Sequence, residues 1–457
     1  MPVTFALFSA FRPHRAAFLS LFVAALVLPV GFGWELPGVT SLDKSTIPLI
    51  SAWAACVFTA SGQLRYLRLS GLTLLFIAVI AIGCMATAIT NGDPYFVYGL
   101  GLQGLSLYDG VGLLRALSFS MLLPYLLGRM LVREVAQVED LLRPFVAGFL
   151  IYSLPMLWEI RMSPQLHTTV YGYFPHSFIQ QMRAGGFRPV VFFGHGLPLA
   201  ITMSFAILGS VILWRRGRTI RGLPSAAVTA YLSGVLVLCK TFSAMIYAYG
   251  GGALIYFTSA KTQMRVALAI ACFTLAYPVM RSFDVFPTQA LTSFFGSASE
   301  DRSESLAFRF ENEDILLDHA MERPMFGWGG YGRNRVFSDD QRDVSVTDGL
   351  WIILIGQLGV VGFVGVFGLM LLPIFQAPRA MANLRSASDR RVLASLALIV
   401  ALSWVDSLPN SMSGGQLMLF VTGAFSGVVA TYQRPRPLRR EPKKEPVPVS
   451  ATGEPLR

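Results

Sequence analysis

The chain has 457 residues, of which 54% are hydrophobic and only 14% charged, with a mean hydropathy of +0.56. Because soluble proteins carry about 25% charged residues, this composition excludes a soluble enzyme, a secreted disulfide scaffold and a disordered chain. The formal net charge of +11 could suggest a nucleic-acid partner, but most cations lie between apolar runs, where they indicate membrane topology. We therefore predict an all-α, multi-pass bundle of transmembrane helices that binds no nucleic acid.

Twelve apolar runs are close to the length of about 20 residues that a membrane-spanning helix needs. The first follows Arg12 and Arg15 and resembles a signal peptide in charge, but it lacks a convincing small-residue cleavage site, so we interpret it as a retained helix. Together the runs predict a single transmembrane domain over residues 1–431. The predicted segments are 16–33, 46–62, 69–89, 111–131, 143–160, 188–214, 224–240, 243–260, 264–281, 349–374, 391–406 and 412–431.

The basic residues gather in alternate connecting segments. With the N-terminus in the cytoplasm, 24 of the 37 Lys and Arg residues fall on the cytoplasmic side, in agreement with the positive-inside rule. After Tyr432 the chain becomes rich in proline and cations, which predicts a disordered basic cytoplasmic tail over 432–457. Both termini are therefore expected in the cytoplasm.

A long polar segment, residues 281–348, separates the ninth and tenth predicted helices on the outer side. It holds 13 of the 26 acidic residues and seven arginines. A loop of this length usually carries function. We predict a large, partly helical external loop.

Cations also mark the outer ends of four predicted helices, at Arg115, Arg188, Lys240 and Arg281. Charged groups at that depth are costly and tend to be functional, and a planar guanidinium suits phosphate oxygens. They predict an anionic ligand at the outer leaflet, with snorkelling of the side chains to lipid headgroups as the alternative. His195, in the outer third of the sixth predicted helix, is either a packed core residue or a supporting group of this pocket.

The external loop contains a predicted amphipathic helix that Pro324 and nearby glycines end. Its apolar positions are Leu306, Phe310, Leu317 and Met321. Arg302 and Arg309 are seven residues apart and share one face of this helix. The alternative for Arg309 is an exposed ion pair with Glu313 at i,i+4.

Gly327, Gly329 and Gly332 have the spacing of a dinucleotide-binding motif, but no strand precedes them, so a compact turn is the better interpretation. The acidic run over 339–343 is expected to be a solvated surface rather than a divalent-cation site. The four cysteines lie in or at the end of apolar runs without a CxxC spacing, which argues against disulfides and zinc. We therefore expect neither a metal nor a cofactor.

Three segments in chain order carry Arg188, Arg309 and Asp348. The first is GGFRPVVFFGHGLPLA (185–200); in the second, Arg309 lies fifteen residues before Pro324 of ERPMFGWGGYG; the third is TDGLWIILIGQLGVVGFVG (347–365). Together they resemble the family of bacterial O-antigen polymerases and O-antigen ligases. Asp348 stands where the ligases carry a histidine, a departure that counts against ligase activity and still leaves a general base.

The resemblance implies an inverting, metal-independent glycosyltransferase at the periplasmic face of the bacterial inner membrane. Its implied substrate is an undecaprenyl-diphosphate-linked oligosaccharide, and its partners are membrane lipids and other polysaccharide-assembly and chain-length proteins. Polymerisation of repeat units into a surface polysaccharide or exopolysaccharide is the leading expectation. The alternatives are a ligase that moves glycan onto a lipid or protein, a polysaccharide transporter or flippase, and a structural membrane subunit.

Within that mechanism Arg188 and Arg309 are predicted to bind the diphosphate, because fixed guanidinium groups can stabilise a leaving group without a metal. Asp348 is predicted to accept the proton of the acceptor hydroxyl. Its alternative role is a helix N-cap before Gly349. The supporting, substrate-binding residues are Arg115, Lys240, Arg302 and His195.

Overall fold

The computed structural model describes residues 1–35, 40–97, 100–183, 185–296, 300–340, 342–411 and 415–433. From residue 434 on, the predicted basic tail lies outside the described residues. Helices dominate the described part of the chain, where the only sheets are four two-stranded antiparallel hairpins. The prediction of an all-α protein is confirmed.

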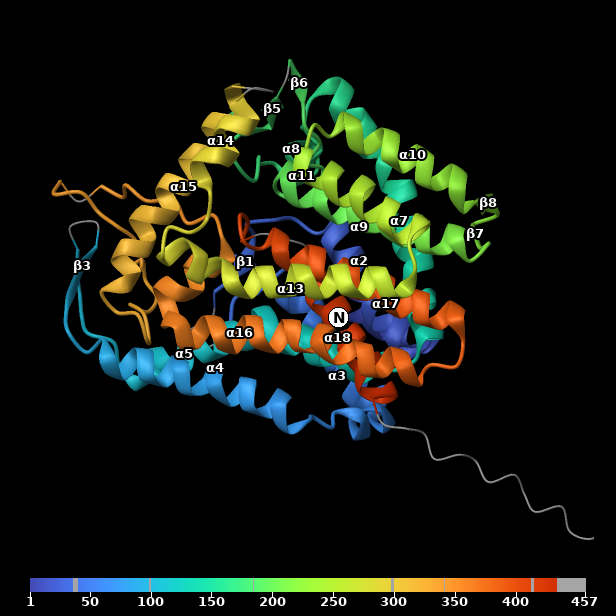
Figure 1. Cartoon of the computed structure of the whole chain (residues 1–457), viewed down its shortest axis with the longest axis horizontal. Coiled ribbons are helices and arrows are strands. Elements are labelled where there is room, and N and C mark those ends of the chain that lie inside the picture. Colours follow the sequence, from blue (N-terminus) through green and yellow to red (C-terminus); the bar gives the residue numbers. More distant parts are fainter. Residues whose placement is uncertain are drawn as a thin grey trace, which may run out of the picture.

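The elements follow one another along the chain as Figure 1 labels them. The helices of the first half are α1 (Pro2–Ala10), α2 (Pro13–Val27), α3 (Thr46–Thr59), α4 (Gly71–Thr90), α5 (Leu107–Leu117), α6 (Leu123–Leu131), α7 (Val135–Met162), α8 (Leu166–Tyr171) and α9 (Gly196–Arg215). Those of the second half are α10 (Ser225–Leu238), α11 (Phe242–Met245), α12 (Gly252–Phe257), α13 (Ala260–Ser282), α14 (Thr288–Gly296), α15 (Glu300–Met321), α16 (Leu350–Asn383), α17 (Ala387–Asp406) and α18 (Gly415–Tyr432).

Short elements complete the fold. The 3-10 turns are η1 (Ser61–Tyr66) and η3 (Ile179–Gln181), and the π-helical turns are η2 (Ser118–Leu122) and η4 (Ile246–Gly251). The hairpins pair β1 (Gly33–Trp34) with β2 (Leu42–Asp43), β3 (Tyr95–Val97) with β4 (Leu100–Leu102), β5 (Met182–Arg183) with β6 (Gly186–Phe187), and β7 (Thr219–Ile220) with β8 (Leu223–Pro224). The turns η2 and η4 continue the helices on either side, so α5–α6 and α11–α12 are each one interrupted rod.

Helix is found in each of the twelve predicted apolar segments. In the described part of the chain, seven helical rods are long and apolar enough to cross a membrane: α4, α5–α6, α7, α9, α13, α16 and α18. Four further apolar helices, α2, α3, α10 and α11–α12, are shorter. The chain therefore has the helices of a multi-pass membrane protein.

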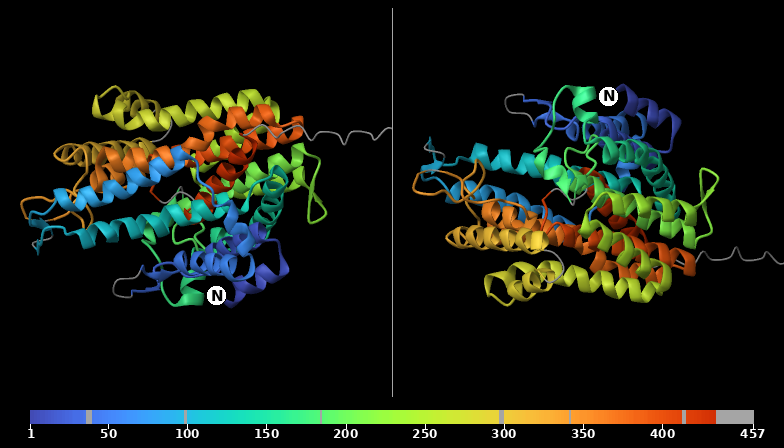
Figure 2. Two further views of the ribbon diagram at one scale, coloured as in Figure 1. Left: turned by 90° about the horizontal axis from the view of Figure 1, so that it is seen from below. Right: turned by 90° about the horizontal axis from the view of Figure 1, so that it is seen from above.

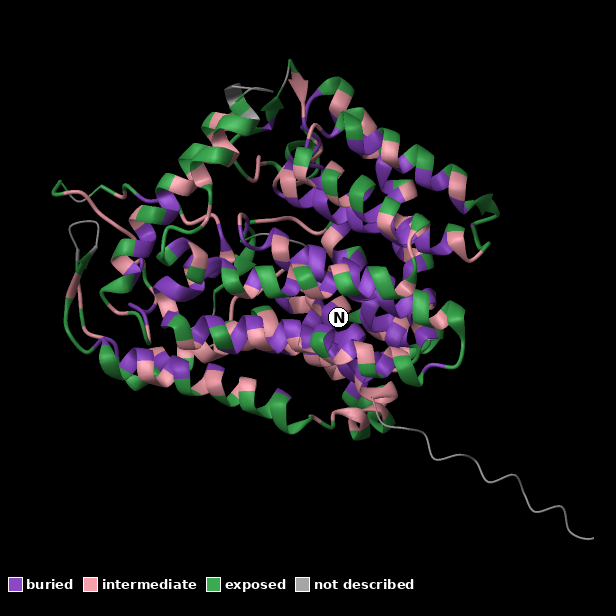
Figure 3. Ribbon diagram, in the orientation of Figure 1, coloured by how far each residue is buried: buried purple, intermediate pink, exposed green. Residues whose placement is uncertain are grey.

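Burial separates central helices from peripheral ones (Figure 3). The apolar stretch of α9 is 89% buried inside the protein, whereas that of α5–α6 is only 28% buried. Helices α6 and α18 pack closely, since a Cβ on Gly128 would lie 2.0 Å from the Phe420 carbonyl oxygen. Gly423 and Gly427 on α18, spaced as GxxxG, similarly allow α6 to approach. The outward apolar faces of the peripheral helices are suited to lipid.

The long segment between α13 and α16 gathers at one end of the bundle. There the lower end of α15 lies beside the start of α16 and near the β3–β4 hairpin, while the β7–β8 hairpin lies at the opposite end (Figures 1 and 2). The segment 281–348 is partly helical, since it contains α14 and α15; that it is external stays a prediction. Arg309 on α15 and Asp348 before α16 lie at this end.

Several predicted boundaries are wrong. Helix α2 ends at Val27 rather than at 33, and α7 begins at Val135 rather than at 143. The sixth segment was expected to begin at Arg188, but α9 begins at Gly196, and residues 188–195 form a loop. The tenth segment was expected to end at residue 374, whereas α16 continues through Pro373 and Pro378 to Asn383. Gly359, with φ +65°, kinks α16 where Met325 and Phe326 press against its backbone.

Candidate functional site

Arg309 and Asp348 form an ion pair at the α15 end of the bundle. The Nε atom of Arg309 lies 3.5 Å from an Asp348 carboxylate oxygen, and the side chains are 31% and 43% exposed. The N-cap of α16 is Gly349, and no side chain caps that helix. The alternative prediction that Asp348 is the N-cap is therefore wrong, and both partners of the pair are accessible to a ligand.

A buried polar network sets the position of Arg309 on α15. One turn further along that helix, Glu313 accepts hydrogen bonds from Tyr277 Oη (2.9 Å) and Trp351 Nε1 (3.3 Å) and pairs with Arg281 Nε (3.2 Å). These contacts fasten α15 to α13 and α16. The alternative pairing of Arg309 with Glu313 is wrong because Arg281, 32 residues away, occupies that carboxylate.

The loop over 188–195 is held by one buried acid of α7. Glu159 is fully buried, and its carboxylate accepts hydrogen bonds from the backbone N–H groups of Leu166 (2.9 Å), Val190 (2.7 Å) and Val191 (2.8 Å). Three charge-assisted hydrogen bonds satisfy a carboxylate that burial would otherwise penalise. Glu159 therefore fixes the loop that carries Arg188.

Arg188 is buried, with 5% of its surface exposed. Its Nη2 atom donates to Thr241 Oγ1 at 3.0 Å, while its Nε atom is buried and has no hydrogen-bond partner among the described residues. Burial, reinforced by the positive charges of Arg183 and Arg309, lowers the pKa of Arg188 to about 10. The group is still charged at neutral pH, and its Nε–H is available to an anionic ligand.

His195 lies in the same positive field. Its Nδ1 atom accepts a hydrogen bond from the Leu197 N–H (3.1 Å), so its side chain caps α9. Burial, followed by the charges of Arg188 and other neighbouring cations that include Arg309, lowers the pKa of His195 to about 4. The imidazole is therefore neutral at physiological pH, with its proton on Nε2. His195 is a capping residue beside the cations.

Lys240 supports the hairpin that precedes Arg188. Its Nζ atom donates to the Arg183 carbonyl oxygen at 2.9 Å, and a Cβ on Gly186 would lie 2.5 Å from that nitrogen. The hairpin thus closes onto the end of α10. Lys240 therefore contacts the site only through the backbone of the β5–β6 hairpin. This contact holds Arg183 near Arg188, although Arg183 was not selected from the sequence.

The remaining predicted cations lie elsewhere or outside the description. Arg115 is on α5, near Tyr331 of the loop after α15. Burial raises the pKa of Tyr331, and the positive charge of Arg115 acts in the opposite direction. Arg281 is engaged by Glu313 and by Asp314, at 2.5 Å. The side chain of Arg302 lies outside the described residues. The cations at the four predicted helix ends therefore do not act as one set.

A second buried acid, at the end of α17, was also not selected from the sequence. Asp406, fully buried at the end of α17, accepts a hydrogen bond from Asn410 Nδ2 (3.1 Å) and is hydrogen-bonded to Tyr247. The charge of Arg309 reaches Tyr247 as well. The sequence did offer a signal for Glu159 and Asp406, because both lie in predicted apolar segments. An acidic residue inside a membrane segment is costly and usually has a role.

The glycine turn after α15 braces α16, and it has the compact form expected. Gly327, Gly329 and Gly332 have positive φ. The Trp328 and Gly329 N–H groups donate to the α16 carbonyls of Gly356 (2.8 Å) and Gln357 (2.9 Å). These contacts lie at the kink of α16.

The acidic run after the glycine turn is paired with neighbouring arginines. Asp340 lies 3.0 Å from Arg342, and Asp343 pairs with Arg335. Within the described residues, no cluster of three His, Cys, Asp or Glu side chains could hold a metal ion.

The site as a whole places buried and half-exposed guanidinium groups opposite one accessible carboxylate. Such an arrangement can bind a multiply charged anion through Arg188 and Arg309 and accept a proton on Asp348. Models of known protein families do not match the chain, and a search among characterised proteins finds no match either. Function must therefore be argued from the site.

Proposed function

We propose that the chain is a membrane glycosyltransferase that polymerises undecaprenyl-diphosphate-linked oligosaccharide repeat units into a surface polysaccharide or exopolysaccharide. The observation that carries the proposal is Arg188, a buried guanidinium with an unused donor, in the same positive field as the accessible Arg309. A buried cation without a charged partner is costly, and an anionic ligand would offset that cost. The diphosphate of a lipid-linked sugar has this charge, as the family resemblance implies.

The proposed reaction is a single displacement at the anomeric carbon. The bond from that carbon to the diphosphate oxygen breaks and its electron pair leaves with the diphosphate, where Arg188 and Arg309 stabilise the charge. The acceptor hydroxyl oxygen forms the new glycosidic bond, and Asp348 takes its proton. Binding of the diphosphate draws Arg309 away from its 3.5 Å pair and frees Asp348. One displacement inverts the anomeric configuration, and guanidinium groups supply the positive charge.

For the topology we propose twelve transmembrane helices in a bacterial inner membrane, with both termini in the cytoplasm and the site at the periplasmic face. The position of one basic segment supports this orientation. The basic segment 215–221 lies around the β7–β8 hairpin, at the opposite end of the bundle from α15 (Figure 1). Positive segments are retained on the cytoplasmic side, so the α15 end faces the periplasm, where membrane lipids and chain-length proteins are the expected partners.

Two other functions compete with polymerisation. A ligase would use the same donor site and differ only in its acceptor, a lipid or a protein. A flippase would carry its charges in a central cavity formed between repeated halves, whereas here Arg309 and Asp348 lie at one end of the bundle. Asp348, an accessible carboxylate beside the cations, favours chemistry over transport.

The test is incubation of the purified protein with lipid-linked repeat units in the absence of nucleotide sugar and ATP. Growth of the glycan chain on the lipid supports polymerase activity. Glycan transfer to an added lipid acceptor without chain growth would favour the ligase. Translocation across vesicles without any new glycosidic bond would favour the flippase.

A further inference from the structure

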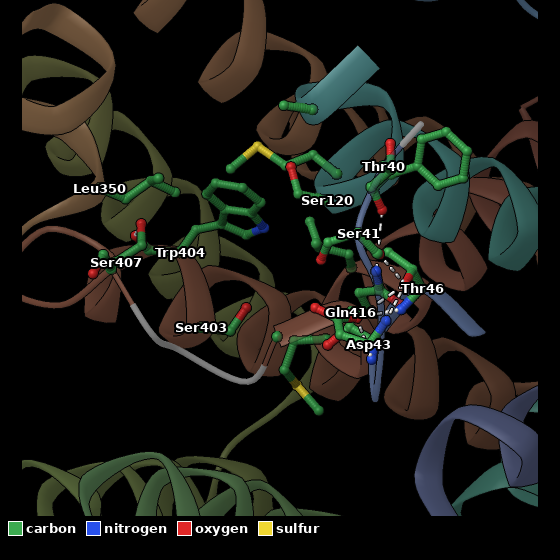
Figure 4. A pocket seen from close by; sticks show the side chains of 18 residues that line it. Thr40, Ser41, Asp43, Thr46, Ser120, Leu350, Ser403, Trp404, Ser407 and Gln416 are labelled. Atoms are coloured by element: carbon green, nitrogen blue, oxygen red, sulfur yellow. Dashed lines mark hydrogen bonds between the residues drawn. The ribbon is translucent and has the colours of Figure 1, made fainter. Parts of the chain in front are cut away.

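A cavity of about 430 Å³ lies where the ends of several helices meet (Figure 4). Its wall comes from the segment before α3, the π-helical turn η2, the starts of α16 and α18, and the end of α17. The volume lies in the range of about 300–1,000 Å³ that is typical of small-molecule sites. None of the residues assigned above to the diphosphate or to proton transfer lines this cavity.

Hydroxyl groups and one indole ring characterise the wall. Thr40, Ser120, Ser403 and Ser407 face the same space as Trp404, which Figure 4 shows between Leu350 and Ser120. The ring of Trp404 packs edge-to-face on Phe367 (5.3 Å) and its Nε1 atom donates to Thr422 (3.3 Å). The indole is thus held in place on the side away from the cavity.

Two oxygens of the wall lack hydrogen bonds. Thr40 Oγ1 and Gln416 Oε1 are buried and have no partner among the described residues. The other end of the Gln416 amide is engaged, because Nε2 donates to the Phe119 carbonyl oxygen (3.1 Å) in η2. π-Helical turns often occur at functional sites, and a buried acceptor without a donor costs free energy unless a ligand or water supplies one.

The Asp43 carboxylate of the wall holds its own segment through one of its two oxygens. Asp43 Oδ1 accepts hydrogen bonds from the N–H groups of Ser45 and Thr46, both at 2.8 Å, and from the Thr46 hydroxyl at 3.0 Å. It therefore organises the start of α3. Gln416 Oε1 and Thr40 Oγ1 remain able to accept hydrogen bonds from a ligand that carries donors.

The cavity adjoins the Arg309–Asp348 site through the junction of α16 and α17. The Leu350 N–H donates to the Ser407 carbonyl oxygen (2.9 Å), and both residues line the cavity. Asp348 lies two residues before Leu350, and the buried Asp406 immediately precedes Ser407. The cavity and the proposed base are therefore both next to the start of α16.

We infer that the cavity binds a carbohydrate, the hydroxyl-bearing acceptor sugar of the transfer; the acceptor role rests on the proposed function. Sugar hydroxyls can donate to Gln416 Oε1 and Thr40 Oγ1, and the apolar face of a sugar ring can pack on the Trp404 indole. A hydrocarbon tail would leave both oxygens unpaired. The wall thus suits a sugar better than a lipid chain.

The test is photolabelling of the full chain in lipid nanodiscs. The probes are alkyl glucoside, galactoside and N-acetylglucosaminide, each with a diazirine beside the sugar, and an alkyl phosphocholine with the same diazirine. We expect at least one glycoside to label peptides of η2 and the start of α18. In Gln416→Leu the labelling should fall roughly two- to tenfold, the range for one lost hydrogen bond.

The matched control is Gln63→Leu, the same change in a different pocket beside Tyr66 and Arg133, which should leave labelling unchanged. Ser120→Trp, which fills the cavity, should abolish labelling while the protein keeps its unfolding transition. Equal labelling by the phosphocholine probe, no labelling by any glycoside, or full labelling in Gln416→Leu overturns the inference. Labelling without chain growth keeps the sugar site and refutes the acceptor role, whereas chain growth without labelling refutes the site alone.

Discussion

Replacing Glu159 by Gln tests how the Arg188 loop is held. The carboxylate accepts two hydrogen bonds on one oxygen, from Val190 and Val191, and one on the other, from Leu166. An amide has only one acceptor oxygen. It will keep the two loop bonds and turn its Nε2 toward the Leu166 N–H, so that two donors face each other.

The expected cost follows from these contacts. One hydrogen bond to a charged group is worth about 1.5–3 kcal/mol, and an unsatisfied buried donor costs about 1–3 kcal/mol. The gain from no longer burying a charge offsets part of this. We expect the free energy of unfolding to fall by about 2–4 kcal/mol. Because the bonds from Val190 and Val191 to a neutral amide oxygen are weaker than those to a carboxylate, we also expect the loop to loosen and Arg188 to react faster with phenylglyoxal.

The assays are denaturant unfolding in detergent, followed by tryptophan fluorescence, and the rate of arginine modification at position 188. The matched control is Glu139→Gln on the same helix, which removes the partner of Arg216, 2.5 Å away. That change should lower stability and leave the reactivity of Arg188 unchanged. If Glu159→Gln changes neither stability nor that reactivity, the assignment of Glu159 is wrong.

Three further changes have outcomes that the structure sets. Arg309→Lys keeps the charge but loses the two-pronged donor, so transfer should slow about 10- to 100-fold in the chain-growth assay, and an unchanged rate would argue against diphosphate binding. His195→Asn keeps an N-cap. The pKa of His195 is about 4 in the folded protein against an ordinary 6.5, so between these pH values the unfolded state binds more protons than the folded state. The free energy of unfolding of the wild type should therefore fall by about 1–3 kcal/mol as the pH is lowered from 6.5 to 4. An equal fall in His195→Asn would contradict this. Gly359→Ala places a Cβ 2.3 Å from the Met325 carbonyl at φ +65°, so the 324–333 turn should detach from α16 and be cleaved faster by protease. The control Gly234→Ala, whose Cβ meets no atom within 4 Å, should leave the cleavage rate unchanged.

Apolar runs were enough to find the helices. The predicted segment 264–281 lies within α13, and 391–406 lies within α17, because a run of this length must be helical to satisfy its backbone in lipid. Boundaries were less certain where loop and helix are both apolar. The apolar composition of residues 188–195 predicts helix. In the structure they form a loop, because the N–H groups of Val190 and Val191 donate to Glu159, about 30 residues earlier in the sequence.

The candidate site was only partly predictable. Local spacing suggested Arg309 with Glu313, but the fold pairs Arg309 with Asp348 and Glu313 with Arg281. These ion-pair partners depend on how α13, α15 and α16 pack against one another. The spacing of residues along a single sequence does not predict that packing. Arg183 drew no attention because nothing local distinguishes it from other loop cations.

The most direct test of the central claim measures release of free lipid diphosphate from a labelled donor after acceptor is added. We expect one diphosphate released per glycosidic bond in the wild type, and a rate about 100- to 10,000-fold lower in Asp348→Asn, as for loss of a general base, with donor binding retained. In Arg188→Met, donor binding itself should be lost. Full release in Asp348→Asn, or normal donor binding in Arg188→Met, would contradict the account.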